Sequence, residues 1–225
     1  MTERAAQISA SLLNADFARL GDEVRRAVDA GVDSIHLDVM DGHFVESLTF
    51  GPGVVEAVRR VSALPYHTHL MVSRPLQQID AFARAGSDLI VAHVEADDDP
   101  AAVIDAIHAT GRSAGLALNP ETPAEAVVPH LGSIEMVLVM TVHPGRGGQA
   151  FLPEVLPKMA WLRDEIARRG LSVPIGVDGG VNLATIAAAR AAGGEVLVAG
   201  WALYQETGDL APAVRALRAA AMGEA

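Results

Sequence analysis

The sequence predicts an α/β fold, a single (β/α)₈ TIM barrel formed by residues 1–225 as one domain. Short apolar runs alternate with longer amphipathic segments, which favours repeated strand–helix units around a parallel sheet. About eight such units are visible, and 225 residues is close to the length of one barrel. No linker or low-complexity tract divides the chain. A doubly wound open sheet is the alternative, because repeat counting alone does not exclude it.

The apolar runs give the predicted strands. Each run is short, as expected for strands that are buried on both faces of a parallel sheet. We expect strands near residues 7–11, 34–39, 65–71, 89–93, 114–118, 136–141, 174–178 and 196–199.

Helices are expected between these strands, and their ends carry recognisable signals. Residues 16–30 should form a helix with Asp16 as N-cap and Gly31 at its end. Residues 75–85 should form another, which opens with a proline and ends at Gly86. The apolar stripe of the first helix is made of Phe17, Leu20, Val24, Ala27 and Val28.

The charge balance excludes several classes of partner. The formal net charge is -11, whereas nucleic acid and anionic membranes are bound by dense Lys and Arg. Apolar runs are far shorter than the roughly 18 residues of a membrane span. No long apolar stretch follows the first four residues, so no secretory signal is expected. We therefore expect a soluble, cytoplasmic protein that binds neither nucleic acid nor membrane.

Two residue types that often carry covalent chemistry are almost missing. The chain has no cysteine, which excludes disulfides, thiolate metal ligands and a two-thiol racemase mechanism. Lys158 is the only lysine, and we expect it in a helix, away from any strand end. This argues against Schiff-base chemistry.

Polar residues gather at the predicted strand ends, where a barrel places its active site. His36 and Asp38 are two residues apart and point to the same side of a strand, as do His67, His69 and Met71. Imidazole and carboxylate groups from separate strands could converge on one divalent metal ion. Taken singly, each is at least as well explained as a cap or a buried structural residue. The full set is Ser11, His36, Asp38, His69, His93, Asn119, Thr141 and Asp178.

Glycine-rich turns form a second pattern. Residues 142–149 follow a predicted strand, and comparable turns follow at 178–180 and 198–201. Such turns expose backbone N–H groups to an anion, and the last strands of a barrel commonly hold phosphate. One glycine turn is weak evidence, but three in adjacent units favour phosphate binding.

Six ordered motifs resemble those of the ribulose-phosphate 3-epimerase family, and they extend over nearly the whole chain. They are ISASLLNADF (8–17), HLDVMDGHFV (36–45), HLMV (69–72), HVEA (93–96), PGRGGQ (144–149) and VDGGV (177–181).

The resemblance implies a reaction and a site. It implies conversion of D-ribulose 5-phosphate to D-xylulose 5-phosphate in the pentose phosphate pathway, by a homo-oligomer that binds one divalent metal ion (Fe²⁺, Mn²⁺, Co²⁺ or Zn²⁺). Asp38 and Asp178 are implied as the acid/base pair. The implied metal ligands are His36, Asp38, His69 and Asp178. The implied substrate contacts are Ser11, Met40, His69, Met71, Met140, Gly145, Arg146, Gly147, Gly148, Gly179, Gly180, Gly200 and Trp201.

Elementary chemistry agrees with these implied roles. A proton on the carbon beside a ketone is weakly acidic, so its removal requires a nearby cation to stabilise the enediolate. One aspartate would remove the proton from one face and the other would return a proton to the opposite face. One must then be ionised while the other is protonated.

Several positions depart from the usual pattern of the family. His143 stands where asparagine is common, Arg146 where phenylalanine is common, and Trp201 where serine is usual; Glu46 and Ser47 replace a frequent Pro-Asn pair. Arg146 could add a charged contact to phosphate or simply point into solvent. These departures leave open a 3-epimerase for another ketose phosphate, such as allulose 6-phosphate or a tetrulose phosphate. A non-catalytic phosphosugar-binding barrel is a more distant alternative.

Overall fold

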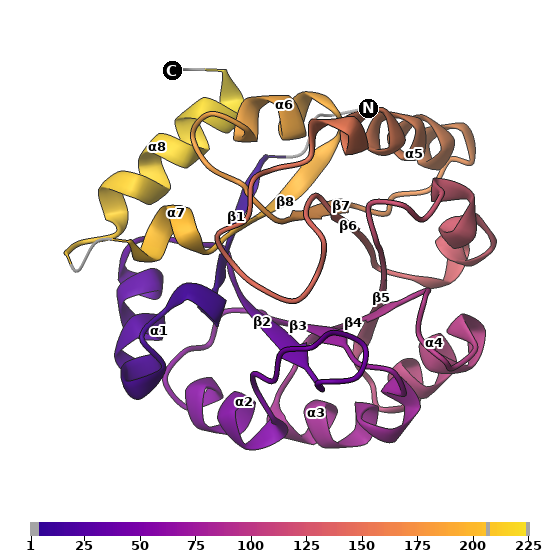
Figure 1. Ribbon diagram of the computed structural model, residues 1–225, viewed down its shortest axis with the longest axis horizontal. Helices are drawn as coiled ribbons and strands as arrows, with labels where there is room; N and C mark the ends of the chain where they lie inside the picture. Colours follow the sequence, from indigo (N-terminus) through magenta and orange to yellow (C-terminus); the bar gives the residue numbers. More distant parts are fainter. Residues whose placement is uncertain (1–4, 206–207, 224–225) are drawn as a thin grey trace.

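The computed structural model describes residues 5–205 and 208–223, and in this part of the chain eight parallel strands close into a barrel (Figure 1). Each strand pairs with the next, and β8 pairs with β1, so the sheet has no open edge. This confirms the TIM barrel over the open-sheet alternative. The strands are β1 Gln7–Ser11, β2 Ser34–Met40, β3 Tyr66–Met71, β4 Leu89–His93, β5 Ser113–Leu118, β6 Met136–Met140, β7 Ile175–Asp178 and β8 Gly194–Ala199.

Helices form a ring outside the strands in Figure 1. The sequence places them correctly between the strands, because amphipathic segments must cover the outer face of the barrel. The α-helices are α1 Leu20–Asp29, α2 Pro52–Arg59, α3 Ile79–Ala85, α4 Pro100–Ala109, α5 Leu156–Arg168, α6 Ile186–Ala191, α7 Trp201–Tyr204 and α8 Ala211–Met222. The 3-10 segments are η1 Leu12–Asn14, η2 Phe17–Arg19, η3 Pro75–Gln77, η4 Ala124–Ser133 and η5 Pro153–Val155.

The two helices expected in detail both begin with a 3-10 turn. Asp16 caps η2 by accepting a hydrogen bond from the N–H of Ala18, but the backbone of Arg19 leaves the helical region and α1 begins only at Leu20. Phe17 therefore lies outside the buried stripe of α1 and is 49% exposed, contrary to expectation. Likewise η3 precedes α3, which ends at Gly86 with a φ of 106°.

The β5–β6 connection contains 3-10 turns in place of an α-helix. Pro129 lies inside this segment, η4. Proline has no N–H and its ring clashes with the preceding helical turn, so a continuous α-helix is disfavoured there.

Side chains alternate between the outer and inner faces of the strands, and this alternation separates two apolar clusters. Outward residues of β2, such as Ile35 and Leu37, join the large cluster that packs against the helices. Inward residues such as Leu89 and Leu138 belong to a smaller apolar cluster within the barrel. Several inward positions nearer the carboxyl ends of the strands, such as His36, Asp38 and His69, are polar, and this end of the barrel holds the site.

No helix in the part of the chain that the structure describes is both long enough and apolar enough to cross a membrane.

Candidate active site

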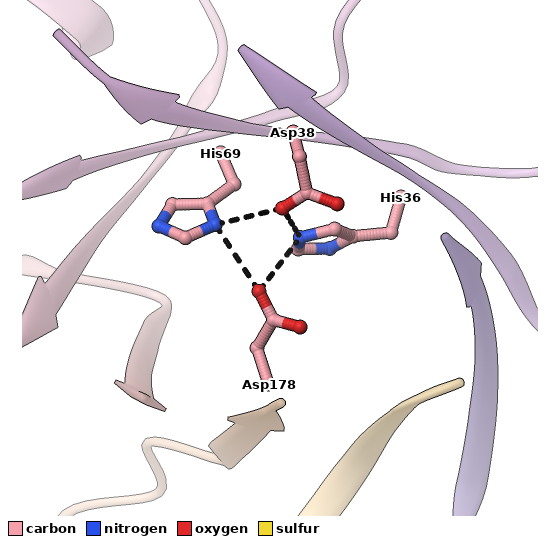
Figure 2. A group of neighbouring side chains, drawn as sticks. All are labelled: His36, Asp38, His69 and Asp178. Atoms are coloured by element: carbon pink, nitrogen blue, oxygen red, sulfur yellow. Dashed lines mark hydrogen bonds and ion pairs between the residues drawn. The ribbon is translucent and has the colours of Figure 1, made fainter. Parts of the chain in front are cut away.

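Four polar side chains meet at the carboxyl end of the barrel (Figure 2). His36 and Asp38 come from β2, His69 from β3 and Asp178 from the last position of β7. Asp38 lies beside His69 in the β2–β3 register, so strand pairing brings the first three together. Asp178 reaches them from the opposite part of the closed sheet.

Nitrogen and oxygen atoms alternate around this group. His36 Nε2 lies 3.2 Å from Asp38 Oδ1 and 3.5 Å from Asp178 Oδ2. His69 Nδ1 lies 3.1 Å and 3.3 Å from the same two oxygens. One ligand atom from each residue lies within 4.8 Å of all the others. Two imidazoles and two carboxylates suit Zn²⁺, Fe²⁺, Mn²⁺ or Co²⁺, so the donor set fits one divalent ion.

The electrostatics of the group are those of histidines held between carboxylates. Burial would lower the pKa of His36, but Asp38 and Asp178 outweigh burial and raise it to about 10. Burial also opposes protonation of His69, yet its hydrogen bonds to Asp178 and Asp38 raise its pKa. Burial would raise the pKa of Asp38, but His36 and His69 hold it below its ordinary value. A divalent cation could therefore take the place of protons on the histidines.

A cavity opens above the four residues and contains most of the predicted substrate contacts. Asp38 and Asp178 line it, whereas His69 is fully buried beneath it. The other predicted residues that line it are Ser11, Met40, Met71, Met140, Gly145, Arg146, Gly147, Gly148, Gly179, Gly180, Gly200 and Trp201. Side chains far apart in the sequence thus share one cavity at the strand ends.

The three glycine turns border this cavity at its β6–β8 side. Gly179 and Gly180 have φ values of 120° and 65°, a region that favours glycine. A Cβ on Gly180 would also lie 2.6 Å from the backbone nitrogen of Phe151, so no larger residue fits. Trp201 is 57% exposed, and its ring lies over Gly148, where an added Cβ would be 3.4 Å from it.

The departures from the usual motifs occupy different places. Arg146 is exposed and lines the cavity, whereas His143 Nδ1 lies 3.0 Å from Glu121 Oε1 and does not line it. Ser47 donates a hydrogen bond to the carbonyl oxygen of Gly145 at 2.6 Å. The loop after β2 is thereby tied to the first glycine turn.

Lys158 lies in a helix as expected, but the expectation that it is away from any strand end is wrong. Its Nζ donates hydrogen bonds to the carbonyl oxygens of Asn119, Pro120 and Thr122, which directly follow β5. The lysine is in the first turn of α5, which begins at the carboxyl end of the barrel, and its long side chain spans to the neighbouring loop. All three ammonium donors are used, which still argues against a Schiff-base role.

Glu95 was missed as part of the site, whereas its neighbour His93 is one of the strand-end candidates. Glu95 accepts a hydrogen bond from the backbone N–H of Asn119 and lies 2.9 Å from His93, which in turn contacts His69. His93 and Glu95 share the i, i+2 spacing of His36 and Asp38. That spacing at a strand end was the available signal.

Comparisons with known proteins agree with the motifs. The model of the "Ribulose-phosphate 3 epimerase family" matches residues 7–204. A protein named ribulose-phosphate 3-epimerase from Bacillus subtilis is 44% identical over 204 residues, covering 89% of this chain and 93% of the relative. One of the same name from Methanocaldococcus jannaschii is 41% identical over 218 residues, covering 96% of this chain and 91% of the relative.

Solved structures share the fold at lower identity. A 3-hexulose-6-phosphate synthase superposes with a TM-score of 0.70 at 23% identity, covering 95% of this chain and 99% of that one. An orotidine 5'-phosphate decarboxylase from Pyrococcus horikoshii superposes with a TM-score of 0.68 at 13% identity, covering 96% of this chain and 100% of that one. These likenesses establish the barrel and nothing finer.

Proposed function

Because the chain belongs to the ribulose-phosphate 3-epimerase family, we propose that it inverts C3 of D-ribulose 5-phosphate to give D-xylulose 5-phosphate. The observation that carries the proposal is the pair of carboxylates, Asp38 and Asp178, which enter one cavity from β2 and β7. Two acid/base groups from opposite strands are what inversion of a carbon centre requires.

His36, Asp38, His69 and Asp178 would hold one divalent ion, which supplies positive charge where negative charge develops on the substrate oxygens. Each aspartate keeps a second oxygen for proton transfer. Asp38 turns Oδ1 toward the histidines and accepts a hydrogen bond from the Ser11 hydroxyl at Oδ2, at 2.7 Å. Asp178 turns Oδ2 toward the histidines, which leaves Oδ1 to exchange a proton with C3.

The remaining cavity residues would orient the sugar and exclude water. Met40, Met71 and Met140 end three strands and are almost fully buried, so they offer polarisable apolar contacts around the reacting carbon. The backbone N–H groups of the three glycine turns would bind the phosphate. Arg146 would add positive charge at the same side.

The wider setting follows from the family. We propose a single catalytic domain over residues 1–225 that works in the pentose phosphate pathway of the cytoplasm as a homo-oligomer.

A second candidate is a 3-epimerase for a different ketose phosphate. It is favoured by Arg146 and Trp201, which line the phosphate side of the cavity and depart from the usual motif residues. A longer or shorter sugar would place its phosphate differently against these two side chains.

Steady-state kinetics on a panel of ketose phosphates separates the candidates. We expect the highest kcat/KM for D-ribulose 5-phosphate over allulose 6-phosphate and a tetrulose phosphate, with Fe²⁺, Mn²⁺, Co²⁺ or Zn²⁺ added in turn. A clear preference for another ketose phosphate would replace the first proposal with the second. Binding of ketose phosphates without turnover under every metal condition would leave only a binding protein.

A further inference from the structure

A second histidine–carboxylate pair lies directly behind the four-residue group. Figure 2 shows the other ring nitrogen of His69 pointing away from Asp38 and Asp178. That nitrogen, Nε2, lies 2.9 Å from Nε2 of His93. Nδ1 of His93 lies 2.9 Å from Oε2 of Glu95. The three side chains therefore form one unbroken hydrogen-bonded chain, His69–His93–Glu95.

Each residue of this hydrogen-bonded series is held in place by further contacts. The side chain of His93 is fully buried, and its ring stacks on that of His69 with centroids 5.0 Å apart. Phe44 contacts the same ring at 4.8 Å. Glu95 is held by the backbone N–H of Asn119, which donates to Oε1 at 2.7 Å.

If His69 binds an ion through Nδ1, the hydrogen bonds of the His69–His93–Glu95 series can be donated in only one direction, from His69 toward Glu95. Nδ1 then offers its lone pair, so Nε2 carries the hydrogen and donates to His93. His93 accepts at Nε2 and must carry its own hydrogen on Nδ1, where it donates to the Glu95 carboxylate. A carboxylate is an obligatory acceptor, so Glu95 sets the direction of the whole chain.

We propose that His93 and Glu95 are positioning residues that hold His69 in the orientation and hydrogen-bonding state needed to bind the metal ion. The inference rests on the metal site of the proposed function. Hydrogen bonds behind a ligating histidine fix its ring and strengthen its binding, and their loss commonly weakens metal affinity about 10- to 100-fold.

Co²⁺ binding to purified, metal-free protein tests the inference without reference to activity. In Glu95→Gln the amide oxygen can still accept from Asn119, but its NH₂ group then faces the hydrogen on His93 Nδ1. Reversing His93 to avoid this conflict also reverses His69 and places a hydrogen on its ligating nitrogen. We expect Co²⁺ affinity to fall by roughly 10- to 100-fold.

Two variants of His93 test whether Co²⁺ affinity can be lost and then restored at the same position. His93→Leu removes the acceptor and should weaken Co²⁺ binding as Glu95→Gln does. His93→Gln can place its amide oxygen near the position of Nε2, so it should restore most of the affinity. The visible absorption spectrum of bound Co²⁺ should change in Glu95→Gln and His93→Leu, which a loss of packing alone would not cause. Thermal unfolding of each metal-free variant confirms that binding is measured on folded protein.

Two controls separate the possible outcomes. His108→Gln disrupts an exposed histidine–glutamate pair, in which Nε2 lies 3.1 Å from Oε2 of Glu135, and should leave Co²⁺ affinity unchanged. Asp178→Asn replaces a charged carboxylate ligand with a neutral amide and should weaken binding strongly. If Asp178→Asn binds weakly while Glu95→Gln and His93→Leu bind like wild type, the inference falls and the proposed function stands. If Asp178→Asn also binds like wild type, the ion is held elsewhere and both fall.

Discussion

At the scale of single residues, the site depends on where the β-strand places alternate side chains. His36 and Asp38 share a face because they are two residues apart, and strand register sets Asp38 beside His69. This much follows from sequence. The His93–Glu95 connection to His69 and the reach of Lys158 do not, because they depend on side-chain directions between neighbouring strands and loops.

Asp178 is the residue whose replacement tests the acid/base pair most simply. We expect Asp178→Asn to lower kcat by at least about 10²- to 10⁴-fold, since an amide cannot exchange the proton. The fold should survive because Asp178 borders the cavity. Kinetics at saturating metal and circular dichroism would measure both effects. Asp164→Asn, on the exposed face of α5, is the matched control, and equal activity in both variants would contradict the role of Asp178.

The pH dependence of metal binding follows from His36. Its pKa is raised from 6.5 to about 10, so below about pH 9 the metal-free histidine is protonated and must release its proton to bind an ion. Co²⁺ affinity should therefore rise by at least about tenfold for each pH unit between about pH 6 and pH 8. Calorimetric titrations in buffers of different ionisation enthalpy would count the protons released. An affinity independent of pH would argue against His36 as a ligand.

The same shift has a consequence for stability. Because the pKa of His36 is raised on folding, its contribution to the stability of the metal-free protein is fully present below pH 6.5 and is lost as the pH rises through about 10. Bound metal should remove this loss, since the histidine is then no longer protonated.

At the scale of elements, the turns that connect strands and helices depend on glycine for two separate reasons. Gly180 combines a φ of 65° with close contact to the backbone of Phe151. Gly111 has a φ of 74° but open space around it. The sequence predicts the glycine turn at residues 178–180, but only the structure distinguishes lack of space at Gly180 from conformational need alone at Gly111, between α4 and β5.

Gly180 and Gly111 can be compared to test the turn at residues 178–180, which is proposed to bind phosphate. Gly111→Ala should cost about 1 kcal/mol of unfolding free energy through backbone strain alone. Gly180→Ala should cost more, by about 1–3 kcal/mol, and should also raise KM because the turn must move. Urea unfolding and steady-state kinetics would measure these changes. Equal unfolding free energies would contradict tight packing of Gly180 against Phe151, and an unchanged KM would contradict a role of this turn in binding substrate.

At the scale of the whole molecule, closure of the sheet is what brings β7 to β2 and β3. The eight strands and the barrel could be predicted because short apolar runs and amphipathic segments alternate along the entire chain. The ends of the helices were less predictable, since Arg19 and Pro129 interrupt helical geometry locally. The meeting of Asp178 with His36 is a property of the closed barrel and of no single segment.

Metal binding should stabilise the entire barrel, because its ligands meet only in the folded state. A free Co²⁺ concentration 100 times the dissociation constant should add about 2.7 kcal/mol to the free energy of unfolding and raise Tm by roughly 5–10 °C. Thermal unfolding with and without Co²⁺, then with EDTA, would measure this. A similar rise in Asp178→Asn would place the ion outside the four-residue site.

The central claim is that Asp38 and Asp178 exchange a proton at C3 of one ketose phosphate. Its most direct test is nuclear magnetic resonance of D-ribulose 5-phosphate in D₂O with the metal-loaded protein. We expect deuterium to enter at C3 alone, together with formation of D-xylulose 5-phosphate, and no D-xylulose 5-phosphate with Asp178→Asn. Absence of C3 exchange with all of Fe²⁺, Mn²⁺, Co²⁺ and Zn²⁺, or exchange at C1 instead, would contradict the account.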